Sequence, residues 1–100
     1  MLMVSVTDEQ PQDSTELLLL ATERQVHAFD LSQCSRVTIG RHESNDLPLS
    51  SRTVSNFHTE IVKENGELIV RDLGSTNGTH VNDLPIDSVV ANHGDQIPIP

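Results

Sequence analysis

Apolar and polar positions along the chain alternate or form short runs, and no helical period holds for three turns. Short apolar or alternating segments separated by Gly, Pro, Asn and Asp predict β-strands rather than helices. Leu47-Pro48-Leu49 predicts a brief edge piece, since proline cannot donate to a sheet ladder. We expect strands at 17–22, 26–31, 36–39, 57–64, 67–73, 79–81, 84–86, 89–91 and 96–100. The pattern therefore predicts an all-β sandwich of two antiparallel sheets with about ten or eleven short strands.

Two asparagine-glycine pairs mark the sharpest turns. Asn65-Gly66 lies between two strand-like runs and predicts a two-residue hairpin, because both residues tolerate positive φ. Asn77-Gly78 belongs to a longer polar turn between two further predicted strands. Ser75 and Thr76 add hydroxyl groups beyond what that turn needs, so we expect this loop to carry binding function.

The two ends of the chain differ from its middle. Residues 1 to 15 include a polar and acidic run, so we expect a flexible acidic leader followed by one domain over residues 16–100. The final strand-like run starts at Gln96 and stops at Pro100. We expect this last strand to be truncated and to leave an open sheet edge, where another copy could associate.

Charge and composition narrow the class of partner. Fifteen Asp and Glu against six Lys and Arg give a formal net charge of −9, which disfavours nucleic acid and anionic membrane surfaces. Two Phe and no Tyr or Trp mean that Leu, Val and Ile must fill the core. No run approaches the roughly 20 apolar residues of a membrane span, and the first residues lack the features of a signal peptide. We therefore expect an intracellular protein, cytoplasmic or nuclear, in which Cys34 forms no disulfide.

Three separated pieces carry the candidate chemistry. They are Gly40-Arg41 after a strand, Ser55-Asn56-Phe57-His58 before another, and Ser75-Thr76-Asn77-Gly78-Thr79 in the polar turn. Their order and spacing resemble the forkhead-associated (FHA) domain, and the resemblance covers about residues 16 to 100. It implies a β-sandwich that recognises phosphothreonine peptides through loops at one end and has no enzymatic activity.

The resemblance implies a phosphate site made by few residues. Arg41 would donate its guanidinium and Ser55 its hydroxyl to the phosphate, and Thr76 would add contacts from its own loop. A phosphomonoester near neutral pH carries between one and two negative charges and three acceptor oxygens, so one planar cation and several neutral donors suit it. Some relatives carry a second cation where Thr53 stands, and Arg52 one residue earlier is a further candidate.

Amide side chains would hold the peptide itself. Asn56 and Asn77 resemble the residues that bind the backbone of an extended peptide in this family, and Ser75 is a further candidate in the same loop. The residues implied to support the loops are Gly40, His58 and Gly78. The expected partner is a phosphothreonine-containing protein or peptide, and no cofactor is expected.

Other functions fit parts of the sequence. A hydrolase would pair Ser55 with His58, but residues three apart in a strand point to opposite faces, and no carboxylate is placed to orient the histidine. The other histidines lack metal-ligand spacing, so no metal site is expected. The alternative function is phospho-independent assembly through a sheet face or the open edge. A phosphorylated Thr7 or Thr15 in the leader would also let one copy bind another.

Overall fold

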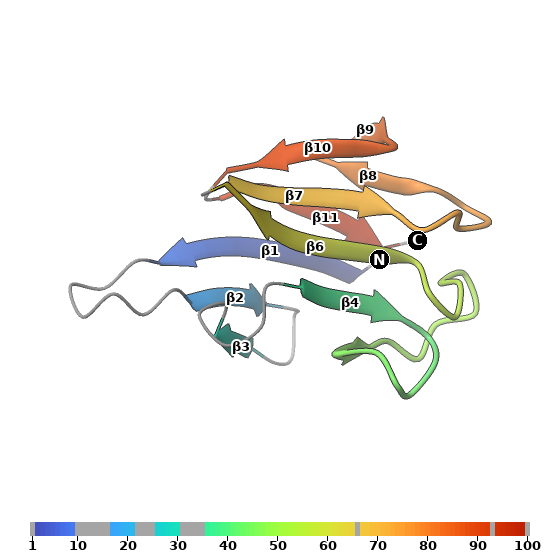
Figure 1. The fold of residues 1–100 in the computed structure, drawn as a ribbon. Coiled ribbons are helices and arrows are strands. Elements are labelled where there is room, and N and C mark those ends of the chain that lie inside the picture. Colours follow the sequence, from blue (N-terminus) through green and yellow to red (C-terminus); the bar gives the residue numbers. More distant parts are fainter. Residues whose placement is uncertain are drawn as a thin grey trace.

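The structure, a computed structural model, describes residues 2–9, 17–21, 26–30, 36–65, 67–92 and 94–99. This part of the chain forms eleven strands and no helix, so the predicted all-β sandwich is confirmed. Two main layers make the sandwich, a four-stranded sheet of order β11-β1-β2-β3 and a five-stranded sheet of order β10-β7-β6-β4-β5. A two-stranded ribbon, β8-β9, completes the fold beside them (Figure 1). In these residues no helix is long and apolar enough to cross a membrane.

The strand bounds agree with most of the predicted ranges. The four-stranded sheet contains β1 (Leu2–Glu9), β2 (Leu17–Ala21), β3 (Val26–Asp30) and β11 (Gln96–Ile99). The five-stranded sheet contains β4 (Arg36–Gly40), β5 (Leu47–Pro48), β6 (Thr59–Glu64), β7 (Glu67–Asp72) and β10 (Ser88–Ala91). The ribbon contains β8 (Thr79–Val81) and β9 (Leu84–Ile86).

The core is aliphatic, as the composition predicts. Its centre comes from alternate positions of β4 and β7, Val37 and Ile39 in the first and Leu68 and Val70 in the second. Strand β6 adds Ile61, although its first three residues are all buried. Phe29 packs against this core from β3 without being fully buried. The buried apolar residues are Val37, Ile39, Leu47, Leu49, Val54, Ile61, Leu68, Val70, Val81, Ala91 and Ile97.

The hairpin predicted at Asn65-Gly66 is confirmed. Strands β6 and β7 pair antiparallel, and Glu64 lies opposite Glu67 across a two-residue connection. Asn65 has φ of 50°, the left-handed conformation that such a connection requires. The edge position predicted for Pro48 is also confirmed, because β5 ends the five-stranded sheet.

One sheet departs from the predicted antiparallel pattern. β5 runs parallel to β4, with Leu47 beside Ile39 and Pro48 beside Gly40. The chain reverses twice between these strands, through residues 41–46, and returns along the edge of β4 in its original direction. The five-stranded sheet is therefore mixed, while the four-stranded sheet is antiparallel throughout.

The prediction of a flexible leader over residues 1 to 15 is wrong for Leu2–Glu9. These residues form β1, which pairs with β2 on one side and with β11 on the other. Local polarity suggested disorder, but two neighbouring strands satisfy the backbone groups of this segment. The last strand is paired on one side, since Leu2–Ser5 of β1 lies opposite Gln96–Ile99 of β11, and β11 forms an edge of the four-stranded sheet. Residues 10–16, including Thr15, lie outside the described residues.

The turn containing Asn77 and Gly78 connects two sheets rather than two paired strands. β7 pairs with β6 and β10, whereas β8 pairs only with β9 among the described strands. The sequence predicts a polar turn between two strands at this position, and in the structure this turn is the loop over residues 73–78.

The sheet register brings the site loops to one end of the sandwich. Ile39 lies opposite Thr59, and Thr59 lies opposite Asp72 in the next strand. The end of β4, the start of β6 and the end of β7 therefore form one row, and the three loops that carry the candidate residues emerge from it (Figure 1).

Candidate functional site

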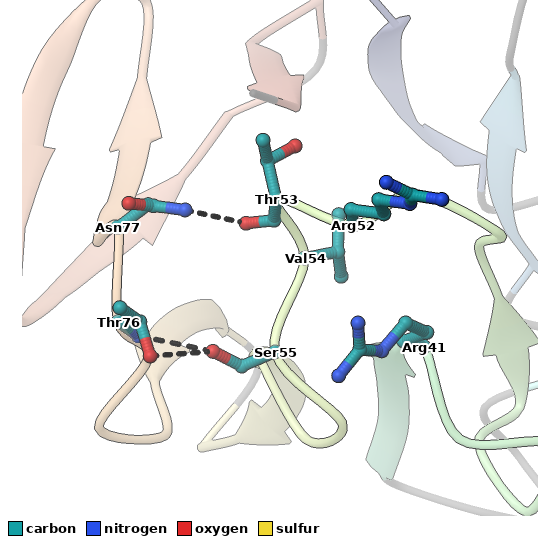
Figure 2. Close-up of a pocket in the computed structure, with 7 residues that line it drawn as sticks. All are labelled: Arg41, Arg52, Thr53, Val54, Ser55, Thr76 and Asn77. Carbon is teal, nitrogen blue, oxygen red and sulfur yellow. Dashed lines mark hydrogen bonds between the residues drawn. The ribbon is translucent and has the colours of Figure 1, made fainter.

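A small hollow lies where these loops meet. It has a volume of about 130 Å³. Small-molecule sites commonly measure about 300–1,000 Å³, so this hollow suits one chemical group of a ligand rather than a whole cofactor. The lining residues are Arg41, Arg52, Thr53, Val54, Ser55, Thr76 and Asn77, and Figure 2 shows them from three separate segments.

The Arg41 segment is held against the Ser55 segment by backbone hydrogen bonds. The Arg41 N–H donates to the Ser55 carbonyl at 3.0 Å, and the His42 N–H donates to the Asn56 carbonyl at 3.2 Å. A Cβ atom at Gly40 would lie 2.2 Å from the Asn56 carbonyl oxygen. Glycine is therefore required at position 40 because another backbone approaches it closely.

Asn45 reinforces this contact, and the sequence analysis did not identify it. Its buried Nδ2 donates to the carbonyls of His42 and Asn56, both at 2.7 Å. One amide thus joins the loop after β4 to the segment before β6. An asparagine in a polar turn carries no pattern that distinguishes this role from ordinary turn formation.

Ser55 faces the loop that contains Thr76. The Thr76 N–H donates to Ser55 Oγ at 3.0 Å, while the two hydroxyl oxygens lie 3.5 Å apart. The short bond uses Ser55 Oγ as an acceptor and leaves its hydrogen weakly engaged. Ser55 can therefore donate that hydrogen to an acceptor placed in the hollow.

His58 joins the same two loops from beneath and is only 2% exposed. Its Nδ1 accepts the Ser55 N–H at 3.1 Å, and its Nε2 lies 2.8 Å from the Gly78 carbonyl, which accepts only if Nε2 carries the proton. β6 begins at Thr59, so the predicted strand over Phe57 and His58 is wrong at its first two residues. The imidazole therefore folds back toward Ser55, but it binds the backbone N–H and not the hydroxyl.

The two asparagines implied to bind peptide have contacts within the chain. Asn77 Nδ2 donates to the Thr53 carbonyl at 2.8 Å, which ties the loop after β7 to the Ser55 segment. Asn56 Oδ1 lies at a long 3.5 Å from the Arg41 Nε donor. Both side chains are exposed, so each also presents polar atoms to solvent at the rim of the hollow.

Asp72 organises the loop after β7, and the sequence analysis missed this role. Its carboxylate accepts the N–H groups of Gly74 and Ser75 at 3.1 and 3.2 Å, the Ser75 hydroxyl at 2.5 Å and the Thr79 hydroxyl at 2.7 Å. The Thr79 hydroxyl donates its hydrogen to Asp72, so in the 2.8 Å contact between the Thr59 and Thr79 hydroxyl groups Thr59 is the donor. The sequence signal for this role is an aspartate two residues before a Gly-Ser pair, because an aspartate side chain often accepts hydrogen bonds from backbone N–H groups in the turn that follows it.

The hydrogen bonds to Asp72 also set its protonation. Burial alone would raise the pKa of Asp72, but the donors from Ser75, Thr79 and Gly74 outweigh it. The pKa of Asp72 therefore lies below its ordinary value, and the carboxylate is ionised at neutral pH. Ser75, whose hydroxyl is donated to Asp72, lies outside the lining of the hollow.

Positive charge is concentrated locally in an acidic chain. Arg41 and Arg52 both line the hollow, although the net charge of the protein is −9. Arg36 and Arg71 instead contact the carboxylate of buried Glu60 on the five-stranded sheet. Charges beyond about 8–10 Å are screened at physiological ionic strength, so the two nearby guanidinium groups dominate the field at the hollow.

Comparison with known proteins identifies the family. The family model described as the FHA domain matches residues 37–100, which include the whole site. The chain belongs to the FHA domain family. The resemblance drawn from the three motifs is thus confirmed, and the match contains Gly40-Arg41, Ser55-x-x-His58 and Asn77-Gly78.

Named relatives of this FHA chain include a regulator and an enzyme inhibitor. It is 38% identical over 96 residues to the glycogen accumulation regulator GarA of Mycolicibacterium smegmatis, covering 96% of this chain and 60% of GarA. It is 35% identical over 95 residues to the oxoglutarate dehydrogenase inhibitor of Corynebacterium diphtheriae, covering 95% of this chain and 66% of that protein. The chain therefore spans less than two thirds of the length of either relative.

A solved structure supports the same fold. Mycobacterium tuberculosis EmbR, in complex with a low-affinity phosphopeptide, superposes with a TM-score of 0.69 at 29% sequence identity. The match covers 98% of this FHA chain and 22% of EmbR. Part of EmbR therefore has the same fold as this chain.

Proposed function

We propose that this chain is a non-catalytic module that recognises phosphothreonine in a partner protein. The observation that carries the proposal is the hollow of about 130 Å³ in which Arg41 and Ser55 meet Thr76. Its volume corresponds to roughly four waters of liquid, which leaves room for one phosphoryl group. One relative is named a regulator, GarA, and another an inhibitor of oxoglutarate dehydrogenase, and EmbR was solved with a phosphopeptide.

The donors around the hollow match the needs of a phosphate. Arg41 supplies a planar cation, and Ser55 supplies a hydroxyl hydrogen that the chain itself uses only weakly. Charge-assisted hydrogen bonds from arginine to phosphate are about twice as strong as neutral ones, so Arg41 supplies most of the affinity. Thr76 adds a neutral hydroxyl, and Arg52 places a second cation at the rim.

Val54 supplies a reason for threonine selectivity. It is the only aliphatic residue in the lining, and it is 1% exposed. A threonine methyl group seated against Val54 would leave water, which contributes about 0.8 kcal/mol, or about fourfold in affinity. A phosphoserine lacks this methyl group. The peptide backbone would run across the exposed amides of Asn56 and Asn77.

The non-catalytic and intracellular parts of the proposal rest on the site and the relatives. Both ring nitrogens of His58 bind backbone groups, so His58 does not act as a base toward Ser55. The relatives are named as a regulator and an enzyme inhibitor rather than as enzymes. An inhibitor of oxoglutarate dehydrogenase acts where that enzyme is, which supports an intracellular role.

Self-association through a phosphorylated N-terminal segment is a secondary proposal. Thr7 lies in β1 opposite Leu19, so its phosphate could enter another copy only if β1 separated from β2. Thr15, the other candidate, lies outside the described residues. Association through the last strand is a further proposal, because β11 lies at an edge of the four-stranded sheet. One of its carbonyls, that of Gln96, already accepts the Asn82 N–H at 2.7 Å.

The test is calorimetric titration of the chain with degenerate phosphothreonine, phosphoserine and unphosphorylated peptide pools. We expect heat from the phosphothreonine pool, at least about fourfold weaker binding of phosphoserine, and none from the unphosphorylated pool. Arg41→Ala should weaken phosphothreonine binding by about 10- to 100-fold, because it removes a hydrogen-bonded cation from the phosphate.

Arg36→Ala is the matched control. It removes the same charge from the start of β4, about 16 Å along the strand from Arg41, and leaves the hollow intact. We expect its phosphopeptide affinity to stay within about twofold of the wild type. Equal weakening by both variants would show that net charge, and not the hollow, binds the peptide, and the proposal would be wrong.

A further inference from the structure

The chain exposes one of its two phenylalanines beside the hollow. Phe57 is 49% exposed, while the next residue, His58, is buried at 2%. The usual preference is reversed here, since aromatic rings are ordinarily buried and histidines are intermediate. An exposed aromatic side chain at the rim of a binding site commonly serves as a contact for a ligand.

Phe57 forms part of a rigid surface. Its ring stacks on His42, with centroids 5.4 Å apart and planes inclined by 24°. His42 is itself fixed, because its Nδ1 lies 3.1 Å from the Ser44 N–H and 2.8 Å from Ser44 Oγ. We call this stacked pair the His42-Phe57 platform. A surface that is ordered before binding loses little conformational entropy when a ligand contacts it.

The platform is joined directly to the phosphate-binding residues. His42 follows Arg41 and donates its N–H to the Asn56 carbonyl at 3.2 Å, and Phe57 follows Asn56. Phe57 lies two positions after Ser55, with Asn56 between them, a span of at most about 7 Å. In an extended peptide, side chains two positions apart point to the same side and also lie about 7 Å apart.

We propose that the His42-Phe57 platform is a specificity subsite for a hydrophobic side chain of the phosphopeptide, within two residues of the phosphothreonine. This inference rests on the proposed phosphothreonine recognition and adds a sequence preference to it. The phosphate anchors in the hollow, and the neighbouring hydrophobic residue covers the exposed face of Phe57. Partial burial of that face should raise affinity by about five- to tenfold over a peptide with alanine at the same position.

The experiment uses phosphothreonine peptide libraries in which one position at a time is randomised, from two residues before to two residues after the phosphothreonine. The wild type should select hydrophobic residues at one of these positions. Phe57→Ser should lose that selection while it retains binding of the pool and preference for phosphothreonine. Phe57→Leu should retain part of the selection, since it keeps an apolar surface.

Val90→Ser is the matched control, because Val90 is 43% exposed and lies on β10, away from the hollow. It should select as the wild type does. Thermal unfolding should show that both serine variants remain folded, which their exposure allows. Selection that survives in Phe57→Ser, the absence of any selection in the wild type, or selection of a basic residue would each overturn the inference.

The two proposals fail in different ways. If the wild type binds the phosphothreonine pool without positional preference, the platform is not a subsite and phosphothreonine recognition stands. If no phosphopeptide binds, recognition itself is wrong and the subsite fails with it. If Phe57→Ser changes only the sedimentation of the protein, the platform contacts a second copy and the inference is overturned.

Discussion

The loop after β7, residues 73–78, and the segment before β6, residues 52–57, face each other but use their polar groups in opposite ways. In the first, one carboxylate, Asp72, accepts four hydrogen bonds from three residues, so the loop satisfies itself. In the segment before β6, Ser55 Oγ accepts one hydrogen bond, and its own hydroxyl hydrogen makes only a long contact of 3.5 Å with Thr76 Oγ1. Arg52 and Phe57 of the same segment are exposed. The difference shows how the two segments divide the work. The loop after β7 is fixed by its own hydrogen bonds and positions the segment before β6, where Ser55 keeps a hydrogen-bond donor for a ligand.

The largest expected effect comes from removing the acceptor that orders the first loop. Asp72→Ala should lower the free energy of unfolding by about 3 kcal/mol, because four donors lose one shared partner. Urea denaturation measures this change. Glu67→Ala, an exposed carboxylate at the other end of β7, should change stability by no more than about 0.5 kcal/mol. Equal losses in both variants would contradict the role given to Asp72.

Ser55→Ala should separate binding from stability. Without its hydroxyl the phosphate loses one donor, so we expect about tenfold weaker phosphothreonine binding by calorimetry. Stability should change by less than about 1 kcal/mol, since the bond lost, from the Thr76 N–H, is solvent-exposed. Ser88→Ala, an exposed serine on β10, should leave affinity unchanged. A large loss of stability in Ser55→Ala would place Ser55 with the supporting residues instead.

The smallest effect concerns pH. The pKa of Asp72 is lowered from its ordinary value near 3.8, so ionised Asp72 stabilises the fold fully above that value. This contribution should disappear as pH falls through the lower pKa of the folded state. The stability advantage of the wild type over Asp72→Asn should therefore shrink as the pH falls below the ordinary aspartate pKa of 3.8, as measured in urea titrations. An advantage that grows on acidification would contradict the sign of this shift.

Short-range patterns in the sequence determined much of the fold and the motifs of the site. Alternating or continuous apolar segments bounded by turn residues predicted nine of the eleven strands together with the edge piece at Pro48, because such patterns depend on neighbouring residues alone. Asn65-Gly66 fixed a hairpin because it tolerates a left-handed turn. The ordered motifs around Arg41, Ser55 and Asn77 pointed to the FHA family, which the family match confirmed.

Long-range placement decided what the sequence could not. β1 is ordered by β2 and by β11, and its pairing with β11 joins residues at opposite ends of the chain. Separation in the sequence also hid the hydrogen bond from Asn77 to Thr53 and the one from Asn45 to Asn56, because no local pattern links these residues. Phe57 and His58 show most clearly what the sequence does not predict, since residue type alone favours burial of the phenylalanine and not of the histidine. The structure buries the histidine instead, because its two nitrogens satisfy backbone groups of both loops and leave Phe57 at the surface.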